Sequence, residues 1–406
     1  MLGNTASAVV SVFLLIVVSH ICSVNDTGIF ALAFSVAQMM YVIGTFEMRN
    51  VQVTDFKGHF QFSDFLFFKI ISVLFMGIAT VLFVKLRGYS GDKAAAVYLL
   101  CGYFALLAVS DTFQGEFHRN GFLYMAGKSQ TFEIVISAVL FCVVLLLTGN
   151  FIFSLIFMPV CVILWIVLYD IPKVSLFARC VVQLKKNIFW RLLKASFPLF
   201  LSAFLYQYIF NAPKYAIDSL LDSSAQSVYG YIVMPSAFVN LIGIFFLKPQ
   251  LLNLSKSYIK GKYKYFLIKA FKVFLWIGAA CAFSLICGFL FGIPVLNFIY
   301  GVNLSGMRKL LLILLLSGGF SAASTFFLTL LTVMNCQNYA LVAYSISALF
   351  AFVFSDFFVG KLGLTGAAFS YLFETALLFI ILAIIFVRCF SVKRFERKRK
   401  KSIYER

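Results

Sequence analysis

One apolar stretch of the sequence carries polar side chains at helical spacing. At 100° per residue four of them fall on one side of a helix, namely Gln207, Asn211, Lys214 and Asp218. A Lys or Asp at the centre of a membrane span costs about 2.5 to 3.5 kcal/mol, so such residues commonly face a cavity or a substrate path. The pattern predicts a wettable helix face. A hydrogen-bonded seam between helices, or an ion pair between Lys214 and Asp218, is the structural alternative.

Glu374 is the acidic residue placed deepest in an apolar stretch. Two roles are open for it, a neutral hydrogen-bonded side chain or a group that binds a coupling ion. The three histidines show no paired spacing, and the nine cysteines are scattered without a C-x-x-C motif. We therefore expect inert buried thiols, no metal site, no cofactor and no catalytic residue.

The composition indicates the type of secondary structure that carries these side chains. Hydrophobic residues make up 62% of the 406 residues and charged residues 12%, with a mean hydropathy of +0.99. A soluble domain has about 25% charged residues, so most of this chain must lie in lipid. Because backbone polar groups in lipid must be satisfied internally, we predict an all-α polytopic membrane protein.

Stretches of about 20 apolar residues, the length that crosses a bilayer, predict about twelve spans. Counts of eleven or thirteen are also open. The expected spans are 4–23, 28–47, 65–84, 94–112, 130–148, 151–170, 195–217, 227–247, 268–292, 307–334, 338–359 and 363–388.

The distribution of basic residues predicts the orientation. An even number of spans puts both termini on one side, and basic residues near span ends are retained in the cytoplasm. With both termini in the cytoplasm, most of the 34 lysines and arginines lie inside. Only seven are left outside, namely Lys85, Arg87, Lys93, Lys214, Arg308, Lys309 and Lys361. The net charge of +19 then faces anionic headgroups rather than nucleic acid.

A basic polar interruption divides the chain into two halves. We predict a six-helix bundle over 1–172, a basic cytoplasmic linker over 173–194, a second six-helix bundle over 195–388, and a basic cytoplasmic tail over 389–406. A weak internal repeat supports the division, because YVIGTFEMR (Tyr41–Arg49) aligns with NLIGIFFLK (Asn240–Lys248). Six spans per half give parallel repeats, as in transporters with two similar halves.

Short motifs along the chain carry a family resemblance. They are EMRNVQVTD (47–55), DTFQGE (111–116) with Arg119 and AGK (126–128), NAPKYAID (211–218), MP (234–235) and KPQL (248–251). In these motifs and in the number of spans, the sequence resembles Wzx-type O-antigen and capsular polysaccharide flippases of the multidrug/oligosaccharidyl-lipid/polysaccharide exporter superfamily. The resemblance implies a MATE-like fold of two pseudo-symmetric six-helix bundles.

The resemblance also implies a function, which is to move undecaprenyl-pyrophosphate-linked oligosaccharide repeat units across the bacterial cytoplasmic membrane by alternating access. Five cations would hold or admit the polyprenyl-pyrophosphate-linked glycan, namely Arg49, Arg119, Lys128, Lys214 and Lys248. Gating networks would contain Glu47, Asp55, Asp111, Glu116 and Asp218. The alternative is that Arg49, Lys128 and Lys248 only anchor the topology. Implied partners besides the glycan are membrane lipids, a polysaccharide polymerase and chain-length machinery.

Two other classes of function are open. A cation-coupled antiporter for drugs or other small molecules has a related architecture. A membrane-embedded polysaccharide polymerase or acyltransferase would need catalytic groups that converge in a loop or cleft. The expected outer connections are short, which favours a transporter over such an enzyme.

Overall fold

The computed structural model describes residues 2–55, 59–178, 186–334 and 336–404, and within these ranges the chain forms helices without a β-strand. The chain divides into two compact units. Unit 1 contains Met1–Gln207 and Ser223–Ser227, and unit 2 contains Tyr208–Asp222 and Val228–Arg406. The predicted divisions at 172, 194 and 388 stay predictions, and residues 179–185 of the expected linker lie outside the described residues.

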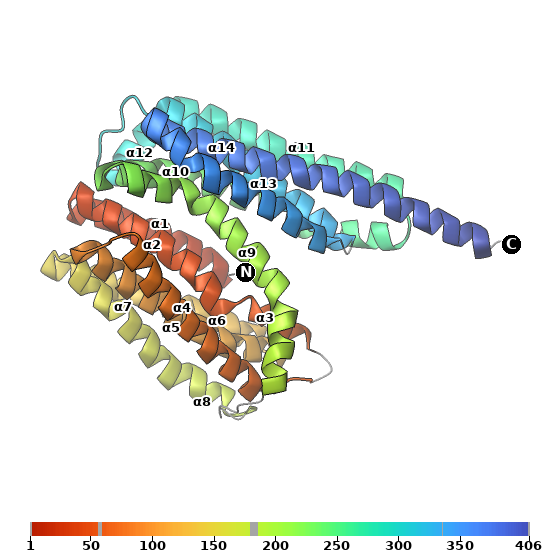
Figure 1. The fold of residues 1–406 in the computed structure, drawn as a ribbon, viewed down its shortest axis with the longest axis horizontal. Coiled ribbons are helices and arrows are strands. Elements are labelled where there is room, and N and C mark those ends of the chain that lie inside the picture. The colour runs from red at the N-terminus through yellow and green to blue at the C-terminus, as the bar shows by residue number, and fades with distance from the viewer. Residues whose placement is uncertain (1, 56–58, 179–185, 335, 405–406) are drawn as a thin grey trace. The chain divides into compact units, whose positions relative to one another are not determined.

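Unit 1 is a helical bundle drawn from red to green in Figure 1. Its helices are α1 (Leu2–Ile21), α2 (Val24–Thr45), α3 (Met48–Thr54), α4 (Phe62–Leu86), α5 (Gly91–Arg119), α6 (Leu123–Thr148), α7 (Phe151–Trp165), a π-helix (Ile166–Asp170), α8 (Ile171–Val174) and the first part of α9 (Lys186–Leu220). The turn between α6 and α7 uses Gly149 in the left-handed region and Asn150 as N-cap, where two spans were expected to meet.

Unit 2 takes the end of α9 and the remaining helices. They are α10 (Ser223–Ile259), α11 (Tyr263–Cys287), a π-helix (Gly288–Gly292), α12 (Ile293–Tyr300), α13 (Arg308–Val333), a 3₁₀ turn (Gln337–Tyr339) and α14 (Ala340–Tyr404). Helix α14 is two helices joined at Gly363, whose φ is 58°. The hydroxyl oxygens of Ser370 and Ser355 lie 3.1 Å apart across the joint, so the two arms lie against each other as a hairpin.

Each of the twelve expected spans overlaps a described helix, and two of them overlap the two arms of α14. Nine described segments are long and apolar enough to cross a membrane, and one of them, Ala340–Lys393, contains the α14 hairpin and so supplies two spans. Helices α1 and α10 occupy the two remaining expected spans, 4–23 and 227–247. The ninth expected span follows α11 and continues through Gly288 as a π-helix.

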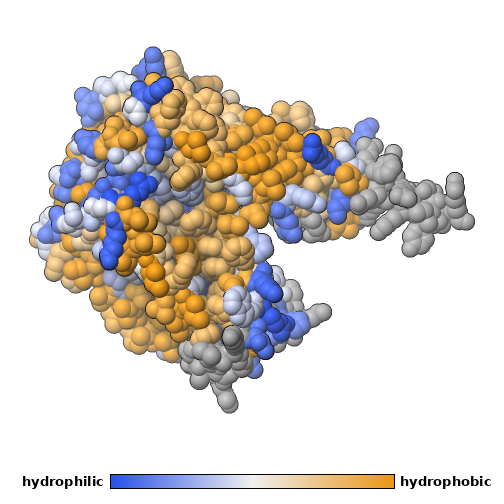
Figure 2. All heavy atoms as spheres, in the orientation of Figure 1, coloured by the Kyte–Doolittle hydropathy of each residue, from blue (hydrophilic) through white to orange (hydrophobic). Residues whose placement is uncertain are grey.

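The surface has the chemistry of a membrane protein. Large apolar side chains are exposed along the helices, and Figure 2 shows hydrophobic residues over much of the visible face. On α4, for example, Leu74, Phe75 and Ile78 are each more than half exposed. Exposed apolar area on this scale is stable only against lipid. The chain is an all-α polytopic membrane protein, as the composition predicted.

One boundary differs from the expectation in a way that matters for function. The second span was expected to run to residue 47, but α2 ends at Thr45. Phe46 and Glu47 both adopt left-handed backbone, with φ of 50° and 51°. Two consecutive non-glycine residues in this region stop the helix, so Arg49 belongs to the separate helix α3.

Candidate functional site

A cavity of about 580 Å³ lies inside unit 1. Helices α2, α3, α5 and α6 line it, and its charged and aromatic lining residues are Tyr41, Glu47, Arg49, Phe104, Asp111, His118 and Glu133. Amides line it as well, namely Asn50, Gln114 and Gln130. Ligand pockets in proteins commonly have volumes of about 300 to 1,000 Å³ and a few placed polar groups. The cavity reaches the end of α3 and the start of α6, at the predicted cytoplasmic end of the spans.

The left-handed break before α3 places Glu47 and Arg49 in this cavity. Phe46 is held there by packing, because its ring stacks on Phe200 with centroids 4.1 Å apart and an interplanar angle of 8°. The amide of Asn50 donates to Glu47 Oε2 at 2.8 Å, which fixes the carboxylate at the start of α3. Left-handed non-glycine residues cost about 1 to 3 kcal/mol each and persist where surrounding contacts hold them, often at functional sites.

Arg49 forms an ion pair across the cavity wall. Its Nη1 lies 3.0 Å from Asp111 Oδ1 and donates to Gln114 Oε1 at 3.3 Å. A second cation, Lys69 on α4, has its Nζ 3.9 Å from Asp111 Oδ2 and donates to the carbonyl oxygen of Thr45 at 3.0 Å. Lys69 is only 1% exposed, whereas the Arg49 side chain is 26% exposed. Arg49 is therefore the cation that a ligand in the cavity can reach.

A buried polar cluster continues behind Gln114. The amide nitrogen of Gln114 donates to Glu133 Oε1 at 2.7 Å and to Ser110 Oγ at 3.0 Å. Ser110 Oγ also lies 2.6 Å from Glu133 Oε2 and 2.9 Å from Asp170 Oδ2. Asp170 ends the π-helix Ile166–Asp170, a wide turn of a kind that often occurs at functional sites. Asp170 is fully buried, so this turn presents its carboxylate to the interior of unit 1.

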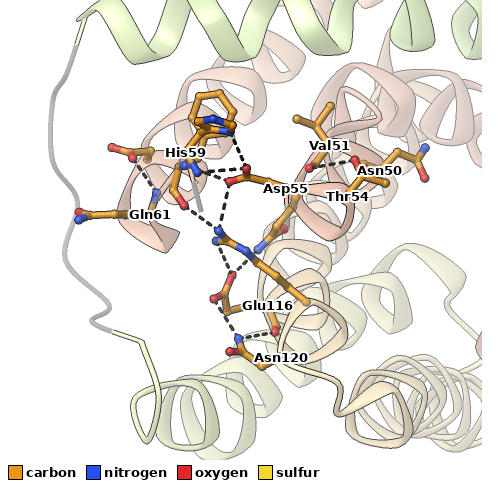
Figure 3. A network of polar contacts seen from close by, with 12 residues as sticks. Asn50, Val51, Thr54, Asp55, His59, Gln61, Glu116 and Asn120 are labelled. Atoms are coloured by element: carbon orange, nitrogen blue, oxygen red, sulfur yellow. Dashed lines mark hydrogen bonds and ion pairs between the residues drawn. The ribbon is translucent and has the colours of Figure 1, made fainter. Parts of the chain in front are cut away.

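A second polar network ties the segment after α3 to the end of α5 (Figure 3). Asp55 accepts hydrogen bonds from the backbone nitrogens of His59 and Phe60, at 3.1 and 2.9 Å, and from Arg119 at 3.2 Å. Arg119 Nη1 lies 3.8 Å from Glu116 Oε2, which also accepts from Gln52 at 2.9 Å. Gly115 permits this close approach, because a Cβ atom there would overlap the side-chain oxygen of Gln52.

Asp55 lies outside the spans, and its ionisation depends on these donors. Burial raises the pKa of the Asp55 carboxyl, but the backbone hydrogen bonds from Phe60 and His59, together with Arg119, outweigh it and hold the pKa below its usual value. A depressed pKa in the folded state means that ionised Asp55 stabilises the fold above about pH 4, and this contribution is lost as the pH falls through the lowered pKa.

We expect Asp55→Asn to destabilise the protein by about 1 to 3 kcal/mol near neutral pH, because charged hydrogen-bond acceptors are lost. The thermal unfolding midpoint of the variant should lie below that of the wild type at neutral pH, and the two should converge as the pH falls below about 4. Asp92→Asn, at an exposed position in the first turn of α5, is the control and should lower the midpoint by much less, since a surface charge at a helix N-terminus contributes at most about 1 kcal/mol. A difference that stays constant with pH would contradict the role of the Asp55 charge.

In unit 2, the predicted polar residues of α9 are largely buried. Lys214 Nζ donates to Asn211 Oδ1 at 3.1 Å and lies 4.8 Å from the ring centroid of Phe210. Asp218 is half-buried one turn further along. Glu374 is fully buried on the second arm of α14, and its Oε1 accepts from Ser355 at 2.9 Å and from Ser370 at 2.5 Å. These serines satisfy one oxygen of the buried carboxyl, whereas Oε2 is buried without a hydrogen-bond partner among the described residues. An ion-coupling role for Glu374 stays a prediction.

The structure brings some of the predicted site residues together and separates others. Glu47, Arg49 and Asp111 line the cavity, and Asp55, Glu116 and Arg119 share the network at its predicted cytoplasmic end. Lys128 is exposed on α6 beside the rings of Phe132 and Tyr169, each 5.9 Å away. Gln207 donates to Gln38 at 3.4 Å within unit 1. The side chain of Lys248 lies outside the described residues.

Sequence reasoning did not single out four polar residues of unit 1, namely Lys69, Gln114, Glu133 and Asp170. A signal for three of them was present, because Lys69 and Glu133 stand inside expected spans and Asp170 ends one. Their proximity comes from packing between α4, α5, α6 and the π-helix. Among the described residues, no group of three or more His, Cys, Asp or Glu side chains is suited to a metal ion.

Comparisons with known proteins bear on the fold. No protein-family profile matches the sequence. The capsular polysaccharide biosynthesis protein CapF of Staphylococcus aureus is 23% identical over 377 residues, covering 90% of this chain and 92% of CapF. The lipid II flippase MurJ in an inward closed conformation superposes with a TM-score of 0.73 at 14% identity, over 97% of this chain and 90% of MurJ.

A multidrug resistance transporter of the MATE family in the MOP superfamily, in an inward-facing conformation, superposes with a TM-score of 0.68 at 12% identity. The superposition covers 98% of this chain and 95% of the transporter. At sequence identities of 12 to 14%, these structural similarities establish the fold and not the function. The chain has the all-helical membrane fold shared by MATE transporters of the MOP superfamily and the lipid II flippase MurJ.

Proposed function

We propose that this protein is a flippase that moves undecaprenyl-pyrophosphate-linked oligosaccharide repeat units across the cytoplasmic membrane for the synthesis of a surface polysaccharide such as O-antigen or capsule. The cavity of unit 1 carries the proposal, since it combines an accessible guanidinium with carboxylates, amides and aromatic rings. The MurJ-like fold and the similarity to a capsular polysaccharide biosynthesis protein support it. Both termini lie in the cytoplasm in this proposal.

Arg49 is the proposed contact for the pyrophosphate. Arginine binds phosphate oxygens with two parallel hydrogen bonds, and a pyrophosphate can compete with Asp111 for this fork. The carboxylates and amides around it supply donors and acceptors for sugar hydroxyls. Binding the anion at the predicted cytoplasmic end of the spans, followed by alternating access of the two halves, would carry the glycan across the membrane.

Deletion of the gene tests the proposed function directly. We expect lipid-linked repeat units to accumulate on the inner leaflet and surface polysaccharide to fall to background. Extracted lipid-linked glycans and their accessibility to a membrane-impermeant glycan-modifying enzyme would measure both effects. Repeat units that reach the outer leaflet but stay unpolymerised would instead indicate a polymerase, and an unchanged pool would refute the proposal.

A cation-coupled antiporter is the second candidate, favoured by one feature of the same cavity. Three carboxylates, Glu47, Asp111 and Glu133, line it beside the aromatic rings of Tyr41 and Phe104, which suits a hydrophobic cation. Thermal unfolding of the purified protein separates the two candidates. Stabilisation by lipid-linked glycans supports the flippase, whereas stabilisation only by hydrophobic cations supports the antiporter.

A further inference from the structure

The hydroxyl of Ser110 lies between two buried carboxyl groups. Its Oγ is 2.6 Å from Glu133 Oε2 and 2.9 Å from Asp170 Oδ2, both within hydrogen-bonding distance. All three side chains are at most 2% exposed. Each remaining carboxylate oxygen already has its own donor, Gln114 for Glu133 and Ser129 for Asp170, at 2.7 Å in both cases.

Counting hydrogens shows that this arrangement lacks one proton when both carboxyls are ionised. A serine hydroxyl has one hydrogen and two lone pairs. Ser110 can donate to only one of the two carboxylate oxygens, so the other would face a lone pair of Ser110 at close range. If one carboxyl carries a proton, that carboxyl donates to Ser110, Ser110 donates to the other, and the Gln114 amide fills the second lone pair. Every group is then satisfied.

We propose that Ser110, Glu133 and Asp170 form a proton-binding site in which the two carboxyls share one proton, and that its occupancy sets the affinity of the unit 1 cavity for an anion. The second part rests on the proposed function. Glu133 lines the cavity, and one amide, Gln114, separates it from Arg49. Loss of the proton adds a negative charge to the cavity wall, which weakens binding of a pyrophosphate beside Arg49.

The charges around the site do not replace the proton. Within the described part of the chain, no lysine or arginine contacts Glu133 or Asp170. The ionisable and aromatic groups that face the site from neighbouring elements are Tyr41 on α2, Arg49 on α3, Lys69 on α4, Tyr103 and Asp111 on α5, and Tyr169 on the π-helix. Asp111 already pairs with both cations. Among the described residues, Glu133 and Asp170 are therefore two buried carboxyls without a cation beside them. A proton shared between them lowers the free energy needed to bury them.

Infrared spectroscopy of the purified full-length protein near neutral pH tests the shared proton. One component of the protonated-carboxyl C=O absorption should be lost in Glu133→Gln, and the same component in Asp170→Asn, because in either variant the remaining carboxylate has one donor for each oxygen. Asp92→Asn, which removes an exposed carboxyl on α5, should leave the band unchanged. Loss of the band in only one variant would mean an isolated protonated acid, and loss in neither would mean two ionised carboxyls. Both results overturn the proposal.

Binding of inorganic pyrophosphate, measured by calorimetry at several pH values, tests the link to the cavity. The affinity of the wild type should fall with rising pH more steeply than that of Glu133→Gln, by up to about ten-fold per pH unit for one linked proton. The titration of pyrophosphate itself is common to both proteins and cancels in the comparison. Parallel pH profiles, or no binding to the wild type at any pH, would overturn the link. The gene-deletion experiment does not depend on either result, so the proposed function can stand or fall separately.

Discussion

Replacement of Arg49 by Glu should abolish export of surface polysaccharide while the protein remains in the membrane at normal abundance. The variant would place a carboxylate beside Asp111 and remove the accessible cation of the cavity. Arg49→Lys should also be impaired, by about ten-fold, since the point charge of an ammonium cannot bind phosphate oxygens with two parallel hydrogen bonds as a guanidinium does. A ten-fold loss corresponds to about 1.4 kcal/mol. Polymer output and membrane abundance are measured for each variant.

The matched control is Arg87→Lys, at the end of α4 and outside the cavity, which should export normally. The weak repeat makes Lys248 the counterpart of Arg49, and Lys248→Arg should be milder than Arg49→Lys because it adds a fork rather than removing one. Topology is unchanged in these three conservative variants, since each keeps the positive charge. Normal output from Arg49→Ala combined with Lys248→Ala, at normal abundance, would refute a headgroup role and leave both residues as anchors.

Gly366→Ala should sharply reduce the amount of folded protein. Gly366 lies just after the joint of the α14 hairpin, where a Cβ atom would overlap the backbone carbonyl oxygen of Phe358 on the facing arm. A backbone atom cannot move aside as a flexible side chain can, so the arms must separate. That separation would disturb the contacts of Ser355 and Ser370 with Glu374. We expect a loss of about 3 kcal/mol, at the upper end of the usual range for overpacking.

Gly360→Ala is the control on the first arm of the same hairpin. A Cβ atom there meets only Leu220 Cδ1 at 3.8 Å, an ordinary contact. Alanine favours a helix over glycine by about 1 kcal/mol, so this variant should be as stable as the wild type or more so. Detergent-solubilised yield and thermal unfolding compare the two variants. Equal stability of both would show that the arms do not approach each other as closely as the structure has them.

The spans were predictable because their signal is local. Twenty apolar residues between polar clusters identify a helix in lipid without reference to its neighbours, and the α6 to α7 turn was readable from Gly149 and Asn150. The end of α2 could not be predicted from the sequence. Phe46 and Glu47 have no turn-forming side chains, and their left-handed backbone is held by tertiary packing of Phe46 on Phe200, more than 150 residues away in the sequence.

The site was predictable in part. The motif around Arg49 and the one around Asp111 were both identified, and the structure joins them by an ion pair. Glu133 and Asp170 were not predicted as site residues, because in the sequence each is an isolated acidic residue within or at the end of a span. Only the packing of α5, α6 and the π-helix places Ser110 between them.

The sequence by itself determined that this chain lies in a membrane, where its apolar helices fall, and which polar residues stand inside or beside them. These properties follow from the hydropathy of continuous segments, which lipid enforces on each helix separately. Only the tertiary structure decided which polar residues meet. Arg49 pairs with Asp111, and Glu133 approaches Asp170, because a backbone break and a π-turn rotate side chains from separate helices toward one interior. Such rotations depend on packing between helices, which no single segment encodes.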